Sequence, residues 1–355
     1  MSSRLVQASG SSFERGNIIG AAVRDRLIRT LGTQEYADQK RGEKSLHDWL
    51  PAAKSFMPYI EDHAPETLLE MYGMAEGAGV SFDDILLLAC AYEKLMGGGA
   101  EHCTGFAAMG AATATGDLVC GQNNDEAIDA WSSGQADIVV HHIAPTGLET
   151  LIYTHPGIPA YMGMNSDGLC VLWMYIDNGE RGPGVPTCII LRELLRRPSL
   201  DAAVSYLRDI PRAVPNNFIL AHAADGICNV EYSTDQFHPV RSSDSLCHAN
   251  HIMDSEMAAA DVTAGLNGGT TRTRHACLAE QMSDNLGDID VETARRMLSD
   301  HHQAPQLVCV HPTRDRPQSK TLASMVFHPA EGTRHIAFGN GCETPYEQYI
   351  FSKTV

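Results

Sequence analysis

The pattern of apolar residues changes abruptly near residue 100, and this change constrains the fold more than any other feature of the sequence. Before it, apolar residues recur three or four positions apart, which predicts helices at about 13–31, 45–61, 65–78 and 81–96. Ser81 and Asp84 have the spacing of a helix-capping residue and its acidic partner. A glycine-rich connection, residues 97–99, then separates the helical part from Cys103.

From Cys103 onward, short apolar runs bounded by Gly, Asn or Asp predict strands joined by hairpins. Helices are expected again at about 187–197, 199–209, 271–284 and 290–300. Strands are expected before, between and after these helix pairs, at 104–112, 118–123, 137–144, 148–155, 160–165, 169–175, 217–223, 227–233, 245–251, 322–328 and 334–340. This order predicts an α+β fold of antiparallel sheets covered by helices rather than a doubly wound parallel sheet.

Charge and hydropathy exclude two classes of partner. The 44 acidic residues outnumber the 26 basic ones, and a net charge of -18 would repel a nucleic-acid backbone. No apolar stretch of about 18 residues occurs and the N-terminus has no apolar signal core, so we expect a cytoplasmic protein that does not bind membranes. The 10 cysteines are spread singly without a CxxC pair, which is typical of a reducing compartment.

Cys103 is the residue whose position most suggests chemistry. It follows the glycine-rich connection and begins the first strand, so backbone cleavage before it would release a free α-amino group. Such an amine has an unperturbed pKa of roughly 7.7 to 8 and can take the thiol proton without help from a histidine. The alternative is a buried structural thiol, which is the usual role of a cysteine.

A series of short motifs runs along nearly the whole chain. They are Gly10–Gly16 with Gly20, Ala75–Gly79, Tyr92-Glu93, Cys103-Thr104, Gly121–Asp125, Gly163–Gly168, Gly184–Pro186, Glu231, His248–His251 and Thr271–Arg274. In this order and spacing they resemble the acyl-coenzyme A:6-aminopenicillanic acid acyltransferase family. That family belongs to the autoproteolytic N-terminal-nucleophile (Ntn) hydrolases, and it includes carcinine and β-alanyl-dopamine hydrolases.

The resemblance implies an αββα sandwich of two antiparallel sheets covered by helices. It also implies self-cleavage between His102 and Cys103, after which the segment 1–102 stays in one domain with 103–355. Cys103 matches the family nucleophile, and Asn250 matches the asparagine that donates to the oxyanion. Asp125 matches the aspartate of a GQNxD motif, and we expect its carboxylate to hold the new α-amine in position without acting as the base. The candidate accessory residues are Thr104, Gln122, Asn123, Arg274 and His311.

The implied reaction is acyl transfer through a thioester on Cys103, most simply hydrolysis of an N-acyl amide of a small molecule. An acyl-CoA-dependent N-acyltransferase is the alternative within the family, although nothing in the sequence marks a coenzyme A site. A catalytically degenerate binding protein and a metal-dependent hydrolase are alternatives of other classes, and homo-oligomerisation stays open. No cofactor or metal is expected: HExxH is absent, and His248 and His251 would point to opposite faces of one strand.

Two positions depart from the family pattern. Val310 stands in a Cys-Val-His stretch where relatives read Cys-Arg-His, and in related Ntn hydrolases an arginine from this region lies close to the nucleophile. Arg314 and Arg316 are candidate substitutes for it. The residue before the nucleophile is Gly in the penicillin acyltransferase and His102 here, so slower self-cleavage is expected because Gly adopts strained turns more easily.

Overall fold

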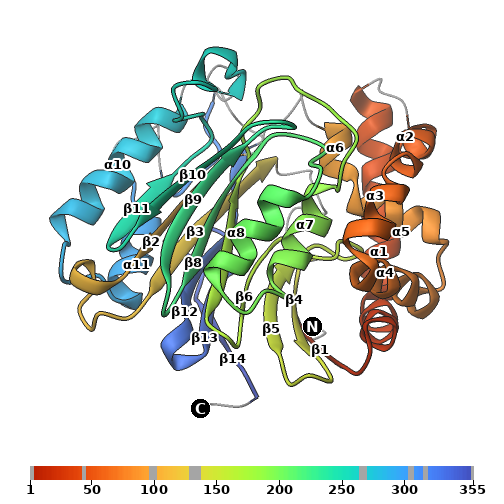
Figure 1. Cartoon of the computed structure of the whole chain (residues 1–355), viewed down its shortest axis with the longest axis horizontal. Coiled ribbons are helices and arrows are strands. Elements are labelled where there is room, and N and C mark those ends of the chain that lie inside the picture. The colour runs from red at the N-terminus through yellow and green to blue at the C-terminus, as the bar shows by residue number, and fades with distance from the viewer. Residues whose placement is uncertain are drawn as a thin grey trace.

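The computed structural model describes residues 4–41, 45–95, 102–127, 137–263, 270–302, 308–314 and 319–352. Two β-sheets lie face to face, with helices on their outer sides (Figure 1). The glycine-rich connection at 97–99 and Arg316 lie outside the described residues.

The larger sheet has eight strands in the order β1-β4-β5-β6-β7-β8-β9-β10. Their bounds are β1 Leu5–Ser9, β4 Ile138–Ile143, β5 Glu149–Thr154, β6 Met162–Asn165, β7 Leu169–Met174, β8 Asn216–His222, β9 Gly226–Tyr232 and β10 Phe237–Ser242. Neighbouring strands from β4 to β10 are antiparallel, as expected. The edge strand β1 instead pairs in parallel with β4, because the chain passes through the helical part and the other sheet before it returns as β4.

The smaller sheet has six antiparallel strands in the order β11-β2-β3-β12-β13-β14. Their bounds are β2 His102–Ala108, β3 Val119–Ala127, β11 Ser245–His248, β12 Ser319–His328, β13 Thr333–Ala337 and β14 Glu347–Ile350. The inner faces of the two sheets meet at β2, β3 and β7. There the side-chain oxygen of Gln122 accepts a 3.0 Å hydrogen bond from the backbone N–H of Trp173, which ties the sheets together.

Helices cover both outer faces (Figure 1). On the larger sheet lie α7 (Thr187–Leu194) and α8 (Leu200–Asp209), and on the smaller sheet lie α10 (Thr270–Asp284) and α11 (Val291–Leu298). Short 3-10 turns occur at η2 Gly110–Ala112, η4 Ala258–Ala260 and η5 Pro329–Glu331. The αββα layering expected from the resemblance is therefore confirmed.

The helices of the first part pack beside this sandwich, at the edge formed by β1 (Figure 1). They are α1 Ser12–Arg41, η1 His47–Trp49, α2 Leu50–Lys54, α3 Met57–His63, α4 Pro65–Ala78, α5 Phe82–Ala89 and α6 Ala91–Leu95. The single helix expected at 45–61 is broken into pieces, since Pro51 and Pro58 each lie in a first helical turn. The capping box of Ser81 and Asp84 begins α5 as predicted.

Glycines allow α1 and α4 to touch along their backbones. A Cβ built on Gly16 would lie 1.9 Å from the carbonyl oxygen of Glu70, and one on Gly73 would lie 2.0 Å from that of Phe13. Gly20 and Gly77 are equally close to the opposite helix. Glycines of the two helical family motifs, Gly10–Gly20 and Ala75–Gly79, therefore serve helix packing, because only Gly permits so close an approach.

None of the described helices, the 30-residue α1 included, is both long enough and apolar enough to cross a membrane.

Candidate active site

Cys103 lies on β2, which pairs with β11 and β3 in the smaller sheet, and is 3% exposed. In the antiparallel register it faces Asn124 of β3, and its Sγ lies 3.8 Å from the side-chain oxygen of Asn124. Asn124 in turn donates a 3.4 Å hydrogen bond to the hydroxyl of Tyr153 on β5 of the larger sheet. Because paired residues share one face of a sheet, the thiol points into the space between the two sheets.

Asn250 fixes the backbone nitrogen of Cys103. It follows β11, the strand beside β2, and its side-chain oxygen accepts a 2.6 Å hydrogen bond from the Cys103 N–H. Its side-chain nitrogen donates to the carbonyl oxygen of Tyr175 at 2.9 Å. The contact with Cys103 is therefore made by the oxygen of Asn250, whereas the sequence assigned this residue to oxyanion donation through its nitrogen. In the uncut chain the geometry suits orientation of the nitrogen that cleavage would turn into the α-amine.

The motif Thr271–Arg274 holds both of these residues in place. Arg274 is buried. Its guanidinium donates a 2.7 Å hydrogen bond to the carbonyl oxygen of Cys103 and a 2.9 Å hydrogen bond to the side-chain oxygen of Asn250. It also contacts Thr104. The Thr271 hydroxyl accepts a 2.7 Å hydrogen bond from the backbone N–H of Asn250. Residues three apart lie on one face of a helix, so α10 presents both side chains to the same site.

Glu231 holds the turn that carries Asn250 from both sides. Its carboxylate contacts the ring of His248 at 2.6 Å and accepts 2.7 Å hydrogen bonds from the backbone N–H groups of Met253 and Asp254. Burial raises the pKa of Glu231, but these contacts outweigh it and lower the pKa overall. This family motif therefore has a positioning role.

Asp125 lies directly beside the bond expected to be cut. In the β2–β3 register it faces His102, and by strand alternation its side chain lies on the opposite face from Asn124. Its Oδ1 accepts a 2.5 Å hydrogen bond from the hydroxyl of Thr321 on β12. The same hydroxyl accepts a 2.9 Å hydrogen bond from the backbone N–H of Val310. Asp125 is thus oriented by Thr321.

Beyond Asn124 lies a buried polar network that sequence reasoning did not identify. The side-chain nitrogen of Asn124 donates a 3.0 Å hydrogen bond to the carboxylate of Glu126, and the hydroxyl of Tyr161 donates a 2.8 Å hydrogen bond to the same carboxylate. His155 lies 3.5 Å from Glu126 and 2.7 Å from Asp137. Burial alone would lower the pKa of His155, but the two carboxylates raise it to about 10, so the ring is a cation near neutral pH.

The remaining accessory candidates separate into different places. Gln122 binds the backbone of β7, and Asn123 donates to the carbonyl oxygens of Leu298 (2.8 Å) and Val308 (2.9 Å), so both serve packing between layers. Thr104 lies at the candidate site through its contact with Arg274. His311 instead contacts Cys342, with its Nε2 3.2 Å from the Cys342 Sγ.

An arginine does lie at Cys103, but it belongs to α10 and not to the region of position 310. Val310 is buried, and its backbone forms hydrogen bonds with Thr321, whereas Arg314 is exposed. Among the described residues it is Arg274 of α10 that donates to Cys103. The motif Thr271–Arg274 had already made Arg274 an accessory candidate, but the sequence did not indicate which groups its guanidinium contacts.

The histidine pair considered for metal binding does not share a strand. β11 ends at His248, so the strand expected at 245–251 is shorter than predicted. The His248 ring contacts Glu231 and the carbonyl oxygen of Ala249, and its centroid lies 6.1 Å from that of His251. Burial lowers the pKa of His251 to about 3.

The model of the acyl-coenzyme A:6-aminopenicillanic acid acyltransferase family matches residues 112–343, more than half of the chain. The match includes Asp125, Asn250 and Arg274 and begins after Cys103. No curated protein sequence matches the chain.

Distant solved structures resemble this one. A variant of the conjugated bile acid hydrolase from Clostridium perfringens is 14% identical with a TM-score of 0.47, and the alignment covers 71% of this chain and 98% of that one. The penicillin V acylase from Agrobacterium tumefaciens is 16% identical with a TM-score of 0.46, covering 71% of this chain and 87% of that one. The family assignment rests on the family match alone.

Proposed function

The chain belongs to the acyl-coenzyme A:6-aminopenicillanic acid acyltransferase family, and we propose that it is a cysteine amidohydrolase that cleaves the N-acyl amide of a small molecule. The observation that carries the proposal is the arrangement around Cys103. Its nitrogen is held by Asn250, its carbonyl oxygen by Arg274, and its thiol points between the sheets.

Processing would begin with attack of the Cys103 thiol on the carbonyl carbon of His102. The C–N bond breaks, the nitrogen takes the thiol proton and becomes the α-amine of Cys103, and a thioester links residue 102 to the sulfur. Water then hydrolyses the thioester, which frees the thiol and leaves a carboxylate on His102. The 2.6 Å hydrogen bond that the Cys103 N–H donates to the Asn250 oxygen already orients the nitrogen that becomes the amine.

Turnover would use the same sulfur and the new amine. The α-amine takes the thiol proton, the thiolate attacks the amide carbonyl, and the proton passes to the departing amine. Water hydrolyses the acyl-thioester and restores the thiol. Arg274 supports this step because it fixes both the Cys103 carbonyl and the Asn250 oxygen, which limits movement of the nucleophile and its base.

The two products of processing should stay together as one domain. Strand β1 pairs with β4, and buried Glu70 of α4 binds Arg192 of α7 through two hydrogen bonds of 2.9 Å. Glu93 of α6 also accepts hydrogen bonds of 2.7 and 2.8 Å from the N–H and hydroxyl of Thr187, at the start of α7. We therefore expect that the segment 1–102 remains bound after cleavage.

Mass spectrometry of the purified protein tests the proposal. Fragments of residues 1–102 and 103–355, about 11 and 27 kDa by their share of 38.5 kDa, are expected from the wild type. Cys103→Ala should stay uncut and inactive on a panel of N-acyl amines that includes β-alanyl amides and penicillins. Cleavage or turnover in Cys103→Ala would refute the mechanism.

The description of the matching family favours a second candidate, an acyl-CoA-dependent N-acyltransferase. In that case an amine rather than water would accept the acyl group from Cys103. Supplying the cleaved protein with an acyl-CoA and an amine separates the two. Free acid as the main product supports the hydrolase, and an N-acyl amide as the main product supports the transferase.

A further inference from the structure

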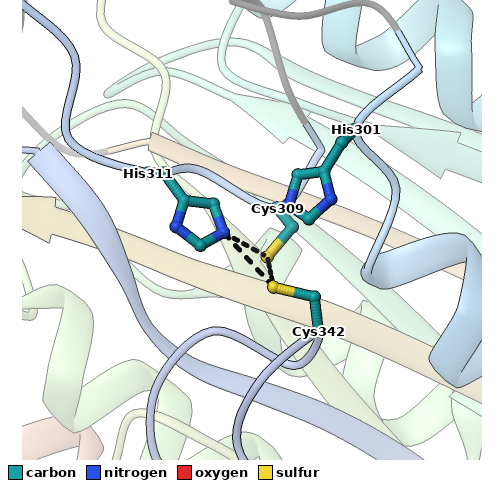
Figure 2. Close-up of side chains that lie close together, drawn as sticks. All are labelled: His301, Cys309, His311 and Cys342. Atoms are coloured by element: carbon teal, nitrogen blue, oxygen red, sulfur yellow. Dashed lines mark hydrogen bonds between the residues drawn. The ribbon is translucent and has the colours of Figure 1, made fainter.

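Two histidines and two cysteines from three segments converge on one point (Figure 2). His301 follows α11, Cys309 and His311 lie in the segment before β12, and Cys342 lies in the turn between β13 and β14. One ligand atom from each of the four lies within 4.8 Å of the others. Neither the acyl-transfer proposal nor the family match assigns a role to this cluster.

The separations between the ligand atoms fit a tetrahedral metal ion. With Zn–S of about 2.3 Å and Zn–N of about 2.05 Å, a tetrahedral ion places two sulfurs about 3.8 Å apart and a sulfur and a nitrogen about 3.6 Å apart. The Cys309 and Cys342 sulfurs are 3.7 Å apart, and the His311 Nε2 lies 3.2 Å from one and 3.8 Å from the other. The His301 ring lies beside that of His311, with 5.0 Å between centroids.

The surroundings of Cys309 suit a thiolate ligand. The side-chain nitrogen of Asn340 donates a 3.3 Å hydrogen bond to the Cys309 sulfur and a 2.7 Å hydrogen bond to the carbonyl oxygen of Val310. Metal-bound thiolates commonly accept such outer hydrogen bonds, which orient the ligand and stabilise its charge. Asn340 is 2% exposed, so this donor is part of the fold.

We propose that His301, Cys309, His311 and Cys342 bind one Zn²⁺ ion. Two thiolates and two imidazoles are the donor set of closed, structural zinc sites, which leave no coordination position for a substrate. The ion would join the segment before β12 to the turn after β13. Since Val310 lies between two ligands and donates to Thr321, the ion would also fix the hydroxyl that orients Asp125.

Metal content measures the proposal directly. The protein is prepared without a histidine tag and in reductant, equilibrated with Zn²⁺, freed of unbound metal and analysed by elemental mass spectrometry. About one zinc per chain is expected for the wild type, and loss of zinc for His311→Ala and Cys342→Ser. A wild type that binds no zinc, or a His311→Ala variant that retains it, would overturn the proposal.

A neighbouring histidine provides a matched control. His301 and His302 are both exposed, and only His301 belongs to the cluster. His301→Ala should weaken zinc binding by at least about tenfold, whereas His302→Ala should keep the wild-type affinity. Because both substitutions are at exposed histidines, the comparison of their zinc affinities can be made even where Cys342→Ser fails to fold. Equal affinities for the two variants would contradict the site.

A disulfide between Cys309 and Cys342 is the competing use of the same sulfurs. Peptide mapping and thiol counting after purification in reductant distinguish the two. A Cys309–Cys342 disulfide that persists and excludes zinc would overturn the proposal. Substitution with Co²⁺ should produce the intense visible absorption of tetrahedral thiolate coordination in the wild type, and its absence there would count equally against the site.

Discussion

Arg274 of α10 donates a 2.7 Å hydrogen bond to the carbonyl oxygen of Cys103 across 171 positions of sequence. A second hydrogen bond of 2.9 Å reaches the Asn250 oxygen, which also binds the Cys103 nitrogen. The guanidinium therefore bridges the two groups that border the candidate nucleophile. It is the geometry of a positioning residue, because the planar fork of Arg fixes two acceptors at once.

We expect Arg274→Lys to lower kcat by about 10- to 100-fold, because hydrogen bonds to a charged donor are worth roughly 1.5–3 kcal/mol. KM should change little, since the contacts of Arg274 are with Cys103, Thr104 and Asn250 and not with the substrate. The matched control is Arg272→Ala, an exposed position on the same helix, which should keep wild-type kcat. A higher KM with an unchanged kcat would contradict a positioning role.

The sequence predicted most of the fold because helical and strand periodicities are local properties. It missed the edge strands β1, β10 and β14, of which β10 carries exposed residues and Pro239. Their strand geometry comes from pairing with a neighbour, which a single segment does not reveal. Similarly, the polar run after Gly121 suggests a turn, yet β3 continues to Ala127 and most of it is buried.

The candidate site was predictable only where residues follow one another in sequence. The motifs identified Cys103, Asp125 and Asn250, but not which atoms meet. The role of Arg274 depends on how α10 crosses β2, and that of Asn124 on the β2–β3 register, so both required the structure. Long-range pairing of this kind leaves no local signal.

The Thr321 hydroxyl should be needed to hold the Asp125 carboxylate in its orientation. Thr321→Val removes the hydroxyl that donates to Asp125 and accepts from Val310, which should lower the free energy of unfolding by about 1–3 kcal/mol and slow processing. Thr321→Ser keeps the hydroxyl and should process at nearly the wild-type rate. Urea unfolding and the rate of fragment appearance measure both effects. Equal processing rates for the Val and Ser variants would show that Asp125 needs no orientation from Thr321.

His102→Gly should speed self-cleavage. Gly reaches the backbone conformations of a strained turn at lower cost than a residue with a Cβ atom. The rate is followed on gels as freshly synthesised precursor converts to the fragment that begins at Cys103. His102→Ala serves as the control, because it removes the imidazole but keeps the Cβ atom. If the Ala variant gains as much as the Gly variant, backbone freedom is not the cause.

His155 predicts a pH dependence of stability. Its pKa is raised from 6.5 to about 10 in the folded state, so its contribution is complete below pH 6.5 and is lost as the pH rises toward 10. The free energy of unfolding of the wild type should therefore decline over this range, by up to about 1.4 kcal/mol per pH unit. Urea unfolding of His155→Gln should show a shallower decline. Parallel curves for the two proteins would exclude a charged His155.

Gly16 and Gly32 lie on the same helix, α1, and should respond in opposite ways to alanine. At Gly16 the added Cβ would meet the Glu70 carbonyl oxygen at 1.9 Å, whereas at Gly32 nothing lies within 4 Å. Gly16→Ala must push α1 from α4 and should lower the free energy of unfolding by more than about 3 kcal/mol. Gly32→Ala should raise it by about 0.4–1 kcal/mol, because Ala has less freedom in the unfolded chain.

The same pair tests how the first segment is retained. Glu70 also binds Arg192 of α7, so displacement of α4 by Gly16→Ala would disturb a buried contact between residues 1–102 and the rest. After processing, size-exclusion chromatography in mild urea should release the 1–102 fragment from Gly16→Ala at lower urea concentration than from Gly32→Ala. Release at the same concentration would mean that β1–β4 pairing, not the Glu70–Arg192 contact between α4 and α7, holds the fragment, because that pairing is unchanged in both variants.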